Sequence, residues 1–115
     1  MKYDIDSQSV EIEKALRNVQ QIFDEYQNLC FTKRTSEFFC LELNGEAGEL
    51  ANLEKKSWKG KTIPAELFFD EAADVMIALM NYSNAKGVDL GRAVREKLIA
   101  IEKKRSILLE NGELY

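Results

Sequence analysis

Helical periodicity is the feature that most limits what this chain can fold into. Apolar side chains recur at steps of three and four residues, and no segment alternates apolar and polar residues with period two. The sequence therefore predicts an all-α fold without a sheet. Capping residues and glycines divide the chain into four helices, expected at about Ser7 to Cys30, Thr35 or Ser36 to Ser57, Pro64 to Gly87, and Asp89 to Glu110.

The length of the chain limits how much surface it can bury. Its 115 residues, 45% of them hydrophobic, suit one globular domain, and no linker or repeat interrupts residues 1–115. A helical domain of this size buries a modest share of its surface, so one face is expected to pack against another subunit. We therefore predict a four-helix bundle that oligomerises through its helices as a homodimer or homotetramer.

Charge and hydropathy exclude two classes of partner. Sixteen basic and 20 acidic residues give a net charge of −4, which argues against a nucleic-acid binder with its broad basic surface. No apolar run approaches the roughly 20 residues that cross a bilayer, and the first ten residues do not resemble a signal peptide. A cytoplasmic protein without a membrane partner is predicted, with Cys30 and Cys40 as buried thiols among apolar neighbours.

Histidine is absent from the chain, and this absence restricts the possible chemistry. It removes Ser-His-Asp and Cys-His catalysis, most zinc sites, and the Glu-x-x-His pairs of di-iron bundles. Any catalysis must therefore use carboxylates, lysines and a hard metal ion.

Two pairs of carboxylates carry the strongest functional signal. Glu46 and Glu49 are three residues apart on the second expected helix, and Glu71 and Asp74 are three apart on the third. Residues at this spacing share a helix face, and Glu42 lies one turn earlier on the first face, as a possible extra ligand or supporting acid. Antiparallel helices joined by a short loop would bring the pairs together. Such a cluster needs cations, and its oxygen ligands favour Mg²⁺ or Mn²⁺.

The E-x-x-E spacing alone is weak evidence, because it is common on solvated helix faces. Glu110 and Glu113 have this spacing without apolar neighbours, and we interpret them as solvated. The second carboxylate pair differs, because it shares a narrow strip with Ala78 and Asn81 opposite a broad apolar face; that face includes Phe69, Val75, Met76 and Met80. Acids are rarely placed against so much apolar surface without a partner. Gly45 and Gly48, inside the second helix, are expected to serve close packing.

The motif Gly45-Glu-Ala-Gly-Glu-Leu-Ala, followed by Glu71-Ala-Ala-Asp-Val, resembles the MazG-like, all-α NTP pyrophosphatase superfamily, and most of all its dCTP pyrophosphatase branch. The resemblance implies a MazG-type bundle that uses Mg²⁺ to hydrolyse a nucleoside triphosphate between the α and β phosphates. Family members clear non-standard or surplus nucleotides in this way. The implied metal ligands are Glu46, Glu49, Glu71 and Asp74, with Glu49 or Glu46 also activating the attacking water.

Substrate contacts are expected from basic and aromatic residues near the helix ends. Trp58 could stack on a base or seal a helix corner or subunit interface, and Asn81 could contact a ribose or a water. Four lysines could hold the departing pyrophosphate or be solvated: Lys59, Lys61, Lys97 and Lys104. The last helix lacks the asparagine that family members often carry there.

Two alternatives remain open. The same fold could act on phosphoribosyl-ATP or on dUTP and dUDP. A non-enzymatic helical interaction module, such as an antitoxin, would instead use its acids as surface groups or salt-bridge partners.

Overall fold

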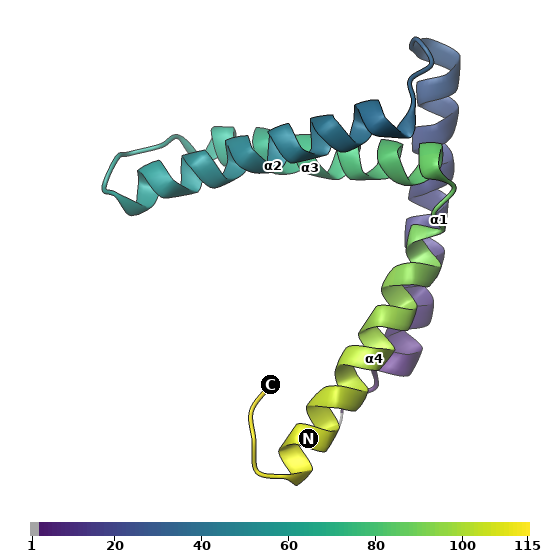
Figure 1. Ribbon diagram of the computed structural model, residues 1–115, viewed down its shortest axis with the longest axis vertical. Helices are drawn as coiled ribbons and strands as arrows, with labels where there is room; N and C mark the ends of the chain where they lie inside the picture. Colours follow the sequence, from purple (N-terminus) through teal and green to yellow (C-terminus); the bar gives the residue numbers. More distant parts are fainter. Residues whose placement is uncertain (1–2) are drawn as a thin grey trace. The chain divides into compact units, whose positions relative to one another are not determined.

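A computed structural model describes residues 3–115, and its secondary structure consists of four helices. The helices, labelled in Figure 1, are α1 (Ile5–Cys30), α2 (Ser36–Trp58), α3 (Ala65–Lys86) and α4 (Leu90–Glu110). None of the described residues forms a strand, so the predicted all-α class is confirmed. These residues divide into two compact units, one of residues 22–87 and one of residues 3–21 with 88–115. The single domain stays a prediction.

The helix ends follow local capping chemistry. Of the two candidate caps of α2, Thr35 is the one used, and its side chain accepts a hydrogen bond from the backbone N–H of Phe38. Asp89 caps α4 as predicted, with its Oδ1 accepting from the N–H of Arg92 at 3.1 Å. Gly87 ends α3 at a φ of 76°, a left-handed conformation that glycine adopts without steric cost.

Two helix starts differ from the sequence-based expectation. Helix α1 begins at Ile5 rather than near Ser7, because Asp4 Oδ1 accepts a hydrogen bond from the Ser7 N–H at 3.1 Å and so caps an earlier turn. Helix α3 begins at Ala65, so Pro64 occupies the capping position instead of the first turn.

In the unit of residues 3–21 and 88–115, α1 and α4 make specific backbone contacts. The buried Gln20 donates from Nε2 to the carbonyl of Val88 at 2.9 Å and accepts at Oε1 from the N–H of Leu90 at 2.8 Å. A Cβ on Gly91 would lie 2.5 Å from the carbonyl oxygen of Glu13, so only glycine fits there. These contacts join the start of α4 to the middle of α1.

In the unit of residues 22–87, α2 and α3 run antiparallel and side by side (Figure 1). Few apolar side chains of the described chain are fully buried, and they all lie in this unit: Phe39, Ala78 and Met80. Several large apolar side chains on the same two helices are exposed, among them Leu41, Leu67, Phe69, Met76 and Ile77. The hairpin therefore keeps an uncovered apolar surface.

The packing of α3 differs in part from the arrangement suggested by its sequence. Ala78 and Asn81, on the narrow strip with the carboxylates, are buried, whereas Phe69 on the broad apolar side is 71% exposed. Met80 on the broad apolar side is also buried, and Glu71 and Asp74 on the strip are half-buried, so parts of both faces pack within the unit.

Two packing expectations were wrong. Cys30 and Cys40 are both exposed, because Cys30 ends α1 and the neighbouring Phe39, not Cys40, takes the buried position on α2. A Cβ on Gly45 or Gly48 would meet no atom within 4 Å, so neither glycine serves close packing within this chain. Within residues 3–115, no helix is both long and apolar enough to cross a membrane.

Candidate metal centre

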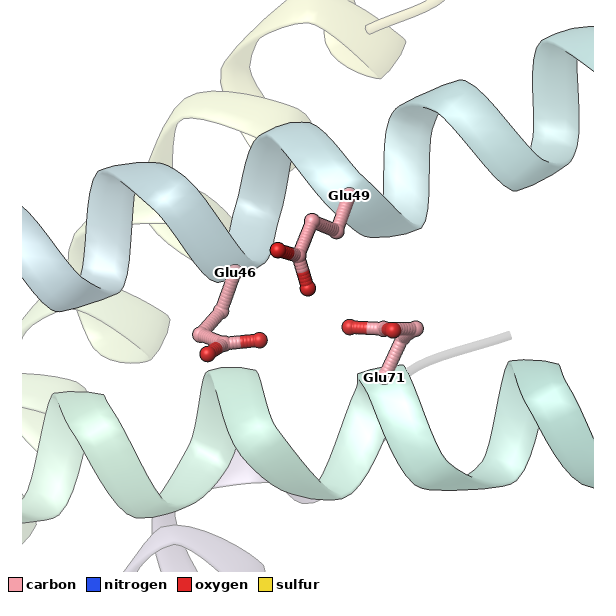
Figure 2. A group of neighbouring side chains, drawn as sticks. All are labelled: Glu46, Glu49 and Glu71. Carbon is pink, nitrogen blue, oxygen red and sulfur yellow. The ribbon is translucent and has the colours of Figure 1, made fainter.

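The α2 and α3 hairpin places three carboxylates opposite one another. Glu46 and Glu49 extend from α2, and Glu71 extends from α3 into the space between the two helices (Figure 2). One carboxylate oxygen from each of the three lies within 4.8 Å of the other two. Asp70, Glu71 and Asp74 form a second group by the same measure. Glu71 belongs to both groups, whereas Asp74 belongs only to the second, so the structure brings Glu46, Glu49 and Glu71 together and places Asp74 beside Glu71.

Local helix geometry explains how so few residues build this cluster. Glu46 and Glu49 are three residues apart, so their side chains leave α2 from neighbouring turns of one face. The antiparallel neighbour α3 presents Glu71 and Asp74 in the same way. Rigid helices therefore position each carboxylate, which suits a site that must hold a fixed geometry.

The electrostatics of the cluster are unfavourable without a cation. Burial, followed by the negative charges of Glu49 and Asp74, raises the pKa of Glu46 to about 7. Burial also raises the pKa of Glu71, together with hydrogen bonding and repulsion from Glu49. The Oε2 atoms of Glu46 and Glu71 are buried and have no hydrogen-bond partner in residues 3–115. Buried carboxylate oxygens in this state are costly unless a cation satisfies them.

The residues present fit a hard divalent metal ion. The donor atoms are all carboxylate oxygens, which favour Mg²⁺ or Mn²⁺ over metals that prefer sulfur or nitrogen. Within the described chain, no lysine or arginine pairs with Glu46, Glu49 or Glu71. Glu102 is an example of a carboxylate that has a basic partner. The hydrogen bond that it accepts from Arg105 lowers its pKa. The cluster is thus built from acids that the chain leaves without a basic partner.

The predicted residues on α2 and in the following loop lie along the hairpin. Glu42 is exposed and lines a cavity of about 500 Å³ rather than joining the carboxylate group. Trp58, the last residue of α2, is 85% exposed. Lys59 and Lys61 follow it in the exposed loop between α2 and α3. Their roles in substrate binding stay predictions.

The remaining predicted substrate residues lie on α3 and α4. Asn81 is buried on α3, two turns beyond Asp74, and lines the same cavity as Glu42. Lys97 and Lys104 belong to α4, in the other unit, and Lys104 places its Nζ 5.2 Å from the centre of the Tyr115 ring. A role for either lysine in holding pyrophosphate stays a prediction.

Asp70 is the one member of the acidic groups that sequence reasoning missed. It precedes Glu71 directly and is exposed, so it lies outside the three-residue pattern used to find the pairs. Its four-residue spacing to Asp74 was the available signal, because residues four apart also share a helix face.

Comparison with protein-family models, curated proteins and solved structures finds no match for this chain. The resemblance to MazG-like enzymes therefore rests on the motif residues alone, and membership of that superfamily stays a prediction.

The raised pKa of Glu46 predicts that the stability of the metal-free protein falls as the pH rises. The folded chain retains a proton that the unfolded chain loses above its ordinary pKa of 4.5, so stability is lost between about pH 4.5 and 7. Thermal unfolding followed by circular dichroism should show a falling Tm across this range. Glu46→Gln should flatten the dependence, and a Tm that rises with pH in both proteins would contradict the prediction.

Proposed function

We propose that this chain is a Mg²⁺-dependent nucleoside triphosphate pyrophosphohydrolase of the MazG-like kind. The observation that carries the proposal is the convergence of Glu46, Glu49 and Glu71, with two buried oxygens that lack partners. Metal-assisted phosphate hydrolysis is the chemistry that such an all-oxygen cluster serves best. A cytoplasmic role in clearing surplus or non-standard nucleotides would follow from this activity.

Each carboxylate of the cluster has a role in the proposed reaction. Glu46, Glu49, Glu71 and Asp74 would hold Mg²⁺, or Mn²⁺ in its place, and the bound metal would offset phosphate charge and polarise the α-phosphate. Glu49 or Glu46 would orient the attacking water and accept its proton. The water oxygen bonds to the α-phosphorus, the bond to the bridging oxygen of the β-phosphate breaks, and pyrophosphate leaves with that electron pair.

The basic loop after α2 supports the leaving group in this proposal. Lys59 and Lys61 are exposed and follow α2 directly, beyond the carboxylates on the hairpin. Ammonium groups there would attract the negative charge that develops on the departing pyrophosphate. Lys97 and Lys104 of α4 are the further candidates for this role.

A second copy of the chain would complete the fold as a homodimer or homotetramer of the MazG type. The exposed Leu41, Phe69 and Met76 of the hairpin support this, because exposed apolar clusters mark protein interfaces. Sedimentation velocity should show a dimer or tetramer at micromolar concentrations. A monomer at all concentrations would remove this part of the proposal.

The activity can be tested by pyrophosphate release from a panel of canonical and modified nucleoside triphosphates, with and without Mg²⁺. Including dUTP, dUDP and phosphoribosyl-ATP separates the alternative substrates. Mg²⁺ should also raise the Tm in the absence of nucleotide, since a concentration of 100 Kd stabilises by about 2.7 kcal/mol. A non-enzymatic interaction module would release no pyrophosphate and show no Tm change with Mg²⁺.

A further inference from the structure

An aromatic cavity lies beside the candidate metal centre in the unit of residues 22–87. It measures about 500 Å³ and is bounded by the end of α1, the start of α2 and the second half of α3. Its lining includes five aromatic side chains: Phe23, Tyr26, Phe31, Phe38 and Phe39. This aromatic lining suits a flat, partly apolar ligand.

Four of the aromatic side chains that line this cavity contact one another in two pairs. Tyr26 and Phe31 form an edge-to-face pair with ring centres 5.0 Å apart, and Phe38 and Phe39 form another at 5.5 Å. The guanidinium of Arg34 lies 4.6 Å from the centre of the Phe38 ring. Tyr26, Phe31 and Phe38 are 58%, 51% and 38% exposed, so their rings are accessible to a planar group that stacks on them.

Asn81 supplies a polar group that the fold does not use. Asn81 is 8% exposed as a whole residue, and its amide makes no hydrogen bond to another group within residues 3–115. It lines both the aromatic cavity and an adjoining polar cavity of about 810 Å³. An amide that borders a cavity and makes no hydrogen bond to the protein can donate and accept hydrogen bonds with a ligand there.

The cavity lining and the carboxylate cluster lie on the same two helices, α2 and α3. Asn81 lies seven residues after Asp74 on α3, and Glu42 in the cavity lining lies four residues before Glu46 on α2. At 1.5 Å per residue, Asn81 is about 10 Å from Asp74 along the helix. A nucleotide with its phosphates at the carboxylates would extend its nucleoside over a distance of this order.

We infer that the aromatic cavity binds the nucleobase of the substrate, with the Asn81 amide hydrogen-bonded to the edge of the base. The inference rests on the proposed function, and it names the part of the substrate that the chain recognises. Aromatic rings stack on any base, whereas an amide donates and accepts hydrogen bonds in one plane and so discriminates among base edges. The base site is then formed by α1, α2 and α3 of one chain.

This assignment places the base away from Trp58, for which stacking on a base was one of the two alternatives that the sequence left open. Trp58 lies 16 residues after Glu42 on the same helix, about 24 Å away along its axis. A nucleoside in the aromatic cavity therefore lies out of reach of the Trp58 side chain of its own chain.

The inference can be tested by titrating the wild-type protein with adenosine, guanosine, cytidine, uridine and thymidine by calorimetry, without metal. At least one nucleoside should bind, because the contacts proposed for the cavity are made to the base and need no phosphate. Asn81→Leu has a similar volume and should lower the affinity for that nucleoside at least about tenfold, because its paired hydrogen bonds are lost. The Tm of this variant should not fall, since the substitution removes no hydrogen bond within the protein.

Control variants test whether a loss of nucleoside affinity is specific to the substitution of Asn81. Asn44→Leu makes the same change at an exposed position of α2 outside both cavities, and it should leave nucleoside affinity unchanged. Glu49→Gln should also leave it unchanged while removing the Tm increase with Mg²⁺. Asn81→Ser provides the same measurement if Asn81→Leu does not fold.

The possible results distinguish this inference from the proposed function. Nucleoside binding that depends on Asn81, in a protein that hydrolyses no triphosphate, would support the cavity assignment and reject the enzyme. Triphosphate hydrolysis with an unchanged kcat/KM in Asn81→Leu would keep the enzyme and overturn the cavity assignment. Failure of every nucleoside to bind would also overturn the cavity assignment.

Discussion

Glu49→Gln is expected to lower the rate of pyrophosphate release by about 100- to 10,000-fold, the contribution typical of a positioned acid or base. The substitution keeps the size of the side chain and removes its charge. The negative charge of Glu49 helps to raise the pKa of both Glu46 and Glu71, so its removal relieves repulsion in the metal-free fold. The same variant should therefore have a higher Tm than the wild type without metal and a smaller Tm increase with Mg²⁺.

The control for this prediction is Glu110→Gln, at the end of α4. Glu110 has an acid three residues later, as Glu46 has, but it is exposed and belongs to none of the acidic groups. This variant should match the wild type in activity, in Tm and in its response to Mg²⁺. If Glu49→Gln retained full activity, or lowered the metal-free Tm, the carboxylate cluster would not be the catalytic metal site.

Gly91→Ala is expected to give the largest loss of stability. An alanine Cβ would lie 2.5 Å from the carbonyl oxygen of Glu13 and 3.2 Å from its carbonyl carbon and Cα, all of them backbone atoms. Neither helix can relieve this overlap by a side-chain rotation, so α1 and α4 would have to separate. Overpacking of this kind costs about 1–3 kcal/mol or more, which should appear as a lower urea midpoint.

The matched control for Gly91→Ala is Gly45→Ala, the same substitution in the interior of α2. No atom lies within 4 Å of the position that its Cβ would take, so the better helix propensity of alanine should stabilise the protein by about 0.8–1 kcal/mol. The two variants should therefore shift the midpoint in opposite directions. A loss of stability in both would indicate that Gly45 packs against another copy of the chain.

Most of the secondary structure could be read from the sequence. Asp89, Thr35 and Gly87 mark their helix ends through hydrogen bonds or backbone angles that involve residues at most four positions away. The start of α1 was placed two residues late because Asp4, outside the periodic apolar pattern, acts as the cap. Errors of this kind stay within one turn, because capping is a local interaction.

The candidate site was only partly predictable. Spacing placed Glu46 beside Glu49, but spacing does not say that this face of α2 turns toward Glu71. The same E-x-x-E spacing at Glu110 leads to an exposed helix end. What separates the two cases is the rotation of α2 against α3, which depends on packing between residues far apart in the chain.

The sequence by itself determined the four helices, the caps at Thr35, Gly87 and Asp89, and the two carboxylate pairs, because these depend on hydrogen bonds and side-chain periodicity within a few residues. Only the tertiary structure decided that Ala78 and Asn81 are buried while Phe69 is exposed, that Asn81 lines an aromatic cavity, and that Gly91 lies against the backbone of α1. Each of these features requires two segments separated by dozens of residues to meet. Their meeting depends on how whole helices rotate and approach one another. The packing that sets this rotation involves residues far apart in the chain, so no local sequence pattern predicts it.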